Sequence, residues 1–438
     1  MTSKINTKTK KIILEKVKEL CVPAHGCTEI GAIGYGVAAA SAQVKGDIRK
    51  VKSIIMEVSP YIFKNVMRVG VPNLGTCGIF MIGAGAAVIA KPERKLEMFS
   101  SITEKERQDA QHLIDKQILH VKIPSHCEPV HVKTIIKNGK DVIESLIEGV
   151  HDNLVYVRVN GKDVIKPVHK STNKNTNKVY VSVDDYKVED LIDIANSCNE
   201  KDLEFLPKLF QLNINISEYG KTNMVPGSYT ETYKKLMDKK PSIYQQIILD
   251  TAAGIDARMS GAVLPVMSSC GSGDHGLTAS IPQFTYHRLT KNSELTFLRS
   301  LLLTNLLVWK IKSNIGSLSC MCGSVIAAVT ATITSIAYQM KLSVKQMCNL
   351  MENLLCTFNS TMCDGAKLSC THKVCTAMIS GIHMIELVKN GYAIKPLDGI
   401  IAGDINKTLL LFRKMSIENS NKYNLSIVNG MCKLNIKM

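Results

Sequence analysis

The sequence predicts an α+β fold, in which an N-terminal mixed α/β part with a β-meander is followed by a largely all-α part. Two observations carry this prediction. Strands and helices mix from "KVKSIIMEVSP" (50–60) onward and give way to short β-branched runs between 119 and 183, and helical hydrophobic periodicity dominates beyond residue 186. A chain of 438 residues is also long enough for two or three domains. We therefore expect a flexible basic tail over 1–11, an α+β domain over 12–185 and a helical domain over 186–438.

The N-terminal domain is predicted to open with two helices. "KIILEKVKELC" (11–21) has helical periodicity, and "VPAHG" interrupts it. "CTEIGAIGYGVAAASAQV" (27–44) then predicts a second, largely buried helix with Cys27 at its start. Farther on, the apolar segment "CGIFMIGAGAAVIA" (77–90) is shorter than the roughly 20 residues that span a bilayer. We expect it to be a buried helix.

Turn residues define the strands that follow. "KNGK" and "VNGK" each separate two β-branched runs, which is typical of a β-hairpin. They predict a β-meander, ending in a flexible low-complexity loop, "HKSTNKNTNK" (169–178). The helical domain has one conspicuous exception, the glycine- and serine-rich segment "DARMSGAVLPVMSSCGSGDHGLTASIP" (256–282).

Composition narrows the class of function. Lysine and arginine exceed aspartate and glutamate by 54 − 38 = 16, but these charges are scattered singly and aromatic residues are only 5%. The basic patches with stacking rings that nucleic-acid binders use are therefore missing, while an acidic small molecule would still be attracted. The basic N-terminus lacks the apolar core of a secretory signal, and fourteen cysteines suit a reducing compartment. We expect a cytoplasmic protein without a membrane or nucleic-acid partner, and a homo-oligomer is compatible with the sequence.

The cysteines are the strongest chemical signal. "SLSCMCGS" (317–324) and "TMCDGAKLSCTHKVC" (361–375) place thiols at the ends of predicted helices, and the chain has no C-x-x-C pair of the kind that zinc sites use. Three thiolates without a fourth suit an iron–sulfur cluster with one open iron, which is a Lewis acid. Buried cysteines that pack as small apolar residues are an equally compatible interpretation.

Cys27 and the glycine-rich segment are further candidates. A thiol at a helix start lies at the positive end of the dipole, which lowers its pKa and suits a base or nucleophile; a structural role is the alternative. Backbone N–H groups of "CGSGDHG" (270–276) suit a carboxylate, which Arg258 would clamp. Ser272 and His275 are then candidate substrate-binding residues, although an ordinary tight turn is commoner. "HCEPVH" (126–131) is a weak metal signal.

Taken in order, several segments resemble the L-cysteine desulfidase family, whose members are relatives of the iron–sulfur L-serine dehydratases. The resemblance covers roughly residues 12–417 and is carried by "GCTEIGAIGYGVAAASA" (26–42), "VSPYIFKNVMRVGVP" (58–72), "DARMSGAVLPVMSSCGSGDHGLTASIP" (256–282), "LSCMCG" (318–323) and "MCDGAKLSCTHKVCTA" (362–377).

The resemblance implies a role for individual residues. Cys27 is the expected catalytic base, and the expected ligands of a 4Fe-4S cluster are Cys322, Cys363 and Cys370. Cys320 replaces Cys322 if the register slips by two residues. Lys64 and Asn65 are implied as polar contacts to the substrate.

The implied reaction is β-elimination of L-cysteine to sulfide, ammonia and pyruvate without pyridoxal phosphate, catalysed by a carbon–sulfur lyase. An iron–sulfur L-serine or L-threonine dehydratase is the closest alternative. A non-catalytic iron–sulfur electron carrier or redox sensor is an alternative from another class. Ile30 stands where the family has proline, and Asp274 and His275 replace a usual amide pair. These last two departures bear on the choice of substrate.

Overall fold

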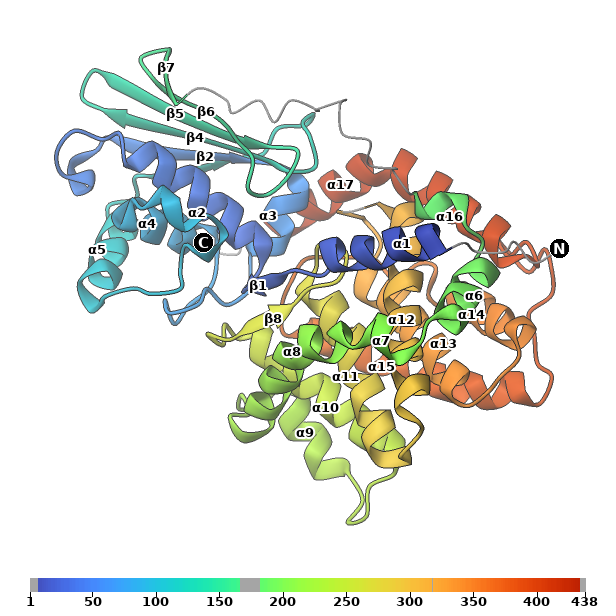
Figure 1. The fold of residues 1–438 in the computed structure, drawn as a ribbon. Coiled ribbons are helices and arrows are strands. Elements are labelled where there is room, and N and C mark those ends of the chain that lie inside the picture. The colour runs from blue at the N-terminus through green and yellow to red at the C-terminus, as the bar shows by residue number, and fades with distance from the viewer. Residues whose placement is uncertain (1–6, 166–181, 317, 434–438) are drawn as a thin grey trace.

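A computed structural model describes residues 7–165, 182–316 and 318–433 (Figure 1). It confirms the α+β class, with a six-stranded sheet and its helices followed by a mostly helical part. The predicted flexible loop at 169–178 lies outside the described residues.

The sheet contains the meander that the turn signals predict. Two earlier strands extend it: β3 comes from within the predicted region 119–183, and β2 precedes that region. The strand order of the sheet is β3-β2-β4-β5-β6-β7. Strands β4 to β7 pair antiparallel in sequence, and Asn160 and Gly161 between β6 and β7 have φ of 51° and 78°, the left-handed backbone of a hairpin turn. Strand β2 pairs parallel with β3 and antiparallel with β4. The strands are β2 (Ser53–Val58), β3 (Leu119–Lys122), β4 (His131–Asn138), β5 (Asp141–Glu148), β6 (Leu154–Val159) and β7 (Lys162–Ile165).

Small residues let helices approach one face of this sheet closely. The side chain of Ser145 in β5 donates a hydrogen bond of 2.6 Å to the carbonyl of Gly36 in α2. A Cβ on Gly83 of α4 would lie 2.5 Å from the Met56 sulfur of β2, so a larger residue there would require the Met56 side chain to move. The predicted buried helices are thus confirmed. The helical elements of this part are α2 (Thr28–Ser41), η1 (Ile48–Lys50), α3 (Pro60–Val66), α4 (Ile79–Ile89), η2 (Pro92–Glu97) and α5 (Glu104–Asp115).

The helical part begins at residue 182, where the described residues resume. Its helices surround the long buried helix α12. A π-helical segment, η4, begins two residues after Cys322, and such segments often occur at functional sites. No helix in the described part of the chain is long and apolar enough to cross a membrane. The elements are η3 (Val183–Asp185), α6 (Val188–Ser197), α7 (Glu200–Leu203), α8 (Phe205–Thr222), α9 (Tyr229–Leu236), α10 (Ile243–Met259), β8 (Pro265–Met267), α11 (Gly273–Thr290), α12 (Glu294–Ile315), η4 (Ser324–Val329), α13 (Thr330–Gln339), α14 (Val344–Phe358), α15 (Ser369–Lys389), α16 (Ile405–Glu418) and α17 (Ser420–Lys433).

The N-terminal segment joins the two parts. Helix α1 (Thr7–Leu20) begins earlier than position 11 and lies along the helical part (Figure 1). Strand β1 (Pro23–His25) then pairs antiparallel with β8 in the helical part. One continuous core of buried residues runs through both parts. Cys27 lies two residues after the end of β1, so this pairing places it where the two parts meet.

Candidate active site

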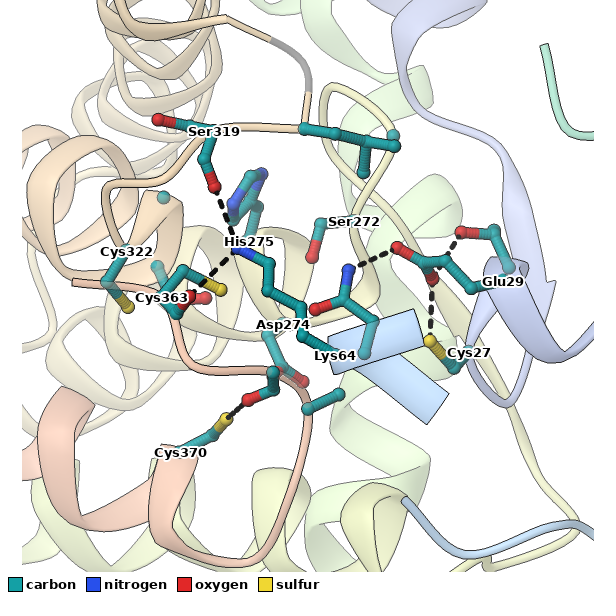
Figure 2. A pocket seen from close by; sticks show the side chains of 18 of the residues that line it. Cys27, Glu29, Lys64, Ser272, Asp274, His275, Ser319, Cys322, Cys363 and Cys370 are labelled. Atoms are coloured by element: carbon teal, nitrogen blue, oxygen red, sulfur yellow. Dashed lines mark hydrogen bonds between the residues drawn. The ribbon is translucent and has the colours of Figure 1, made fainter. Parts of the chain in front are cut away.

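One cavity of about 110 Å³ collects the residues that the sequence singled out (Figure 2). It lies where the start of α2, helix α3, the start of α11 and the cysteine-bearing loops meet. Glu29, Asp274, Lys312 and Lys373 line it as well. The nine predicted site residues on its wall are Cys27, Lys64, Asn65, Arg258, Ser272, His275, Cys322, Cys363 and Cys370.

Three cysteines form one side of this cavity. The loops of Cys322 and Cys363 are joined by an antiparallel bridge, in which the Cys322 N–H donates to the Thr361 carbonyl at 2.9 Å. Cys370 lies in the first turn of α15, and its thiol donates to the Gly365 carbonyl at 3.5 Å. Backbone hydrogen bonds therefore join the loops of Cys322 and Cys363, and a thiol hydrogen bond ties Cys370 to the loop of Cys363.

Cys320 has different surroundings from Cys322. Its thiol donates to the carbonyl of Ser416 in α16, 3.8 Å away, and it does not line the cavity. Its own carbonyl accepts a 2.8 Å hydrogen bond from the Cys363 N–H. The geometry favours Cys322 as the ligand and gives Cys320 a supporting position behind it.

The donor set fits a cluster better than a single ion. Within the described residues, no three His, Cys, Asp or Glu side chains are grouped closely enough to hold one metal ion. In a 4Fe-4S cluster each cysteine binds a different iron, so three thiols spread over one wall suit it. Burial, with Cys363 adding to it, raises the pKa of Cys322 to about 11. Binding to iron would therefore release this thiol proton.

Lysines surround the cysteine wall. Lys64 is 2% exposed, and its ammonium donates to the carbonyls of Ser319 at 3.2 Å and Cys363 at 2.8 Å. It thus ties both cysteine loops to α3, and two of its three donors are already used. Burial lowers the pKa of Lys312 to about 8, although Cys270, Cys363 and Cys322 act against the shift. The positive charges of Lys64 and Lys312 would offset the negative charge of a bound cluster.

The opposite side of the cavity holds Cys27 at the N-cap of α2, as predicted. Its thiol donates to Glu29 Oε2 at 2.6 Å, and Asn65 Nδ2 donates to Glu29 Oε1 at 2.8 Å. The pKa of Cys27 differs from the expectation. Burial raises it well above its ordinary value, and the facing Glu29 carboxylate raises it further, against the attraction of Arg258. These effects outweigh the helix dipole, so the resting Cys27 is a thiol.

Glu29 is a site residue that the sequence analysis missed, as it missed Lys312 and Lys373. Glu29 stands two positions after Cys27 in the GCTE segment and is only 7% exposed. A glutamate in the first helical turn is ordinarily a solvent-exposed partner of the dipole, so its position alone gives no reason to place it in a site. The available signal was its proximity in sequence to the predicted base.

The start of α11 contributes the remaining polar groups. His275 Nδ1 lies 3.2 Å from the Ser269 carbonyl, which only accepts, so Nδ1 carries the proton and Nε2 is an acceptor. Burial lowers the pKa of His275 well below its ordinary value, and Lys312 adds to this, so the ring is neutral. A Cβ on Gly323 would overlap Nε2, so glycine keeps this side of the ring clear.

Arg258 lines the cavity, and two of its nitrogens already have partners within the protein. Its buried Nε has no hydrogen-bond partner among the described residues, and its role as a clamp for a carboxylate stays a prediction. Its Nη1 forms a 2.7 Å ion pair with Asp274 Oδ1, and its Nη2 donates to the Gly26 carbonyl at 3.0 Å. Both charged side chains are 7% exposed. The pair joins α10, the start of α11 and the turn before Cys27.

Comparison with known proteins assigns the chain to a family. The family model described as serine dehydratase alpha chain matches residues 93–429. The chain belongs to this family. Serine dehydratase alpha chains are of the iron–sulfur type, which agrees with the resemblance found in the sequence. The matched region contains Cys322, Cys363 and Cys370, whereas Cys27 and Glu29 precede it.

Relatives of similar length match nearly the whole chain. A UPF0597 protein of Alkaliphilus oremlandii (strain OhILAs) is 31% identical, over 91% of this chain and 93% of the relative. UPF0597 proteins of Clostridium perfringens (strain SM101 / Type A) and Porphyromonas gingivalis (strain ATCC BAA-308 / W83) are each 28% identical. These matches cover 91% and 98% of this chain and 93% and 99% of the relatives.

Proposed function

We propose that the protein is an L-cysteine desulfidase, which eliminates sulfide from L-cysteine and yields ammonia and pyruvate. One observation carries the proposal: Cys27 and the three candidate cluster ligands line the same cavity although they come from the two different parts of the fold. In Figure 2, Cys27 lies at one side and the three cysteines at the other, with Ser272 between them. A β-elimination needs this division between a base and an electrophile.

The roles of the chain's own groups follow from their positions. Cys27 takes the Cα proton once it is ionised, and the N–H groups at the start of α11, beside Ser272, hold the substrate carboxylate. His275 Nε2 accepts a hydrogen bond from the substrate ammonium. A 4Fe-4S cluster on Cys322, Cys363 and Cys370 would supply an open iron as Lewis acid. The aminoacrylate product tautomerises to an imine and hydrolyses in water.

Sulfur as the leaving atom has two supports. The motifs around Cys27 and Cys363 resemble those of L-cysteine desulfidases, and thiolate is a soft ligand that suits iron–sulfur sites. The second candidate is an L-serine or L-threonine dehydratase, which the family description favours and which would use the same groups to expel water. A redox sensor finds less support, because a buried thiol–carboxylate pair in the cavity has no role in it.

The test compares two amino acids under one set of conditions. Protein purified without air, with its cluster reconstituted, is given L-cysteine or L-serine, and sulfide, ammonia and pyruvate are measured. A Cys322→Ala variant carried through the same reconstitution controls for reaction with free iron and sulfide. We expect equimolar sulfide and pyruvate from L-cysteine. Pyruvate from L-serine with little sulfide from L-cysteine would replace the proposal by the dehydratase.

A further inference from the structure

We propose that Glu29 is the proton acceptor that converts the Cys27 thiol into the base of the reaction. The inference rests on the proposed elimination and adds a second proton-transfer group to it. It explains how a buried thiol becomes a thiolate in a site where no arginine or lysine forms a hydrogen bond with it among the described residues.

The geometry of the Cys27–Glu29 pair is suited to proton transfer. Cys27 Sγ and Glu29 Oε2 are 2.6 Å apart, and the two residues are 4% and 7% exposed. Thr28 Oγ1 donates to the same oxygen at 3.1 Å, and Asn65 of α3 donates to the other oxygen at 2.8 Å. Donors from two elements therefore hold the carboxylate toward the thiol instead of toward solvent, as Figure 2 shows for Cys27 and Glu29.

The surrounding charges keep the pair in its thiol and carboxylate form at rest. Although burial raises the pKa of Glu29, His151 and the hydrogen bonds from Cys27 and Asn65 lower it overall. His151 approaches from the turn between β5 and β6. From the helical part, Arg258 of α10 acts on both members of the pair, and Asp274 of α11 interacts with Glu29. The proton thus starts on sulfur, next to an ionised oxygen.

The proton transfers balance over one turnover. The Cys27 S–H bond breaks and an O–H bond forms on Glu29. The thiolate then removes the Cα proton of L-cysteine, the freed electron pair forms the Cα–Cβ double bond, and the C–S bond breaks to release hydrosulfide. The Glu29 proton passes to hydrosulfide, which leaves as hydrogen sulfide. Cys27 keeps the Cα proton, so both residues return to their starting forms.

The experiment measures turnover and thiol reactivity in Glu29→Gln and Glu29→Asp. Iodoacetamide modification of Cys27 is followed by mass spectrometry of its peptide across pH 6 to about 10, because only the thiolate reacts. Removing the like charge lowers the thiol pKa, so we expect Glu29→Gln to react about tenfold faster near pH 8. Its turnover should fall at least about 100-fold, since a positioned proton acceptor is lost. Glu29→Asp keeps the charge and should retain slow alkylation and partial turnover.

Controls separate the proton-transfer role from a structural one. Iron content and melting temperature report whether each variant folds, and Glu104→Gln, which removes an exposed carboxylate on α5, should match wild type in every measurement. Turnover of Glu29→Gln within about threefold of wild type overturns the inference. Lost turnover with an unchanged alkylation profile also overturns it. If wild type converts neither amino acid, the proposed function fails, and the alkylation profiles alone decide whether Glu29 holds the Cys27 proton.

Discussion

At the scale of residues, the surroundings of each thiol decide what it does. Cys320 and Cys322 are one residue apart, yet only Cys322 lines the cavity, while the Cys320 thiol contacts the Ser416 carbonyl. The sequence left this choice open because "CMC" has the same letters at both positions. It placed Cys27 correctly at a helix start, but its pKa depends on burial by distant segments and on the orientation of Glu29. Neither the burial of Cys27 nor the orientation of Glu29 can be predicted from the residues next to Cys27 in the sequence.

The two neighbouring cysteines form a matched pair for a test of the cluster site. Cys322→Ala should abolish binding of iron and sulfide, because it removes one of the three thiolates that we propose as the protein ligands of the cluster. Cys320→Ala changes the same chemical group two positions earlier and should bind at least half of the wild-type iron. Iron content and visible absorption after anaerobic reconstitution measure both. Loss of the cluster in Cys320→Ala with retention in Cys322→Ala would reverse the assignment.

At the scale of elements, hydrophobic periodicity predicted the long helices and turn residues predicted the meander. These local patterns did not predict that β2 would enter the sheet, because its parallel partner β3 follows only after four intervening helical elements. The β1–β8 ladder has three residues in each strand, too few for any alternating pattern to be visible. This short ladder nevertheless places Cys27 beside the start of α11.

Gly365 connects the loop of Cys363 and Cys370 to α3. Its φ is 103°, and a Cβ there would overlap the carbonyl of Lys64. Gly391 is the matched control, because its φ is 89° but nothing lies within 4 Å of its added Cβ. Both alanine variants should lose about 1 kcal/mol of unfolding free energy from backbone strain.

Only Gly365→Ala should lose a further roughly 1–3 kcal/mol from overpacking, together with part of its iron. Urea unfolding and iron content measure these effects. Equal losses of stability and equal iron in the two variants would show that the contact with Lys64 does not hold the cysteine loop.

At the scale of the whole molecule, the cavity exists because the two parts share one core. The α/β part supplies Cys27, Glu29 and Asn65, and the helical part supplies the cysteine wall. Lys64 crosses between them through hydrogen bonds to both cysteine loops. The motifs in the sequence singled out nine of the residues that line the cavity. They could not predict that β1 pairs with β8 to bring these residues together, because long-range pairing leaves no local pattern.

The most direct test of the account is the rate of pyruvate release by Cys27→Ala, measured beside wild type at equal iron content. Residue 27 lies across the cavity from the cysteine wall and is not one of its candidate ligands, so the variant should keep its cluster absorption. Without the base, pyruvate release from L-cysteine should fall at least about 100-fold. An unchanged rate with an intact cluster would contradict the account, in which the α/β part supplies the base and the helical part supplies the electrophile.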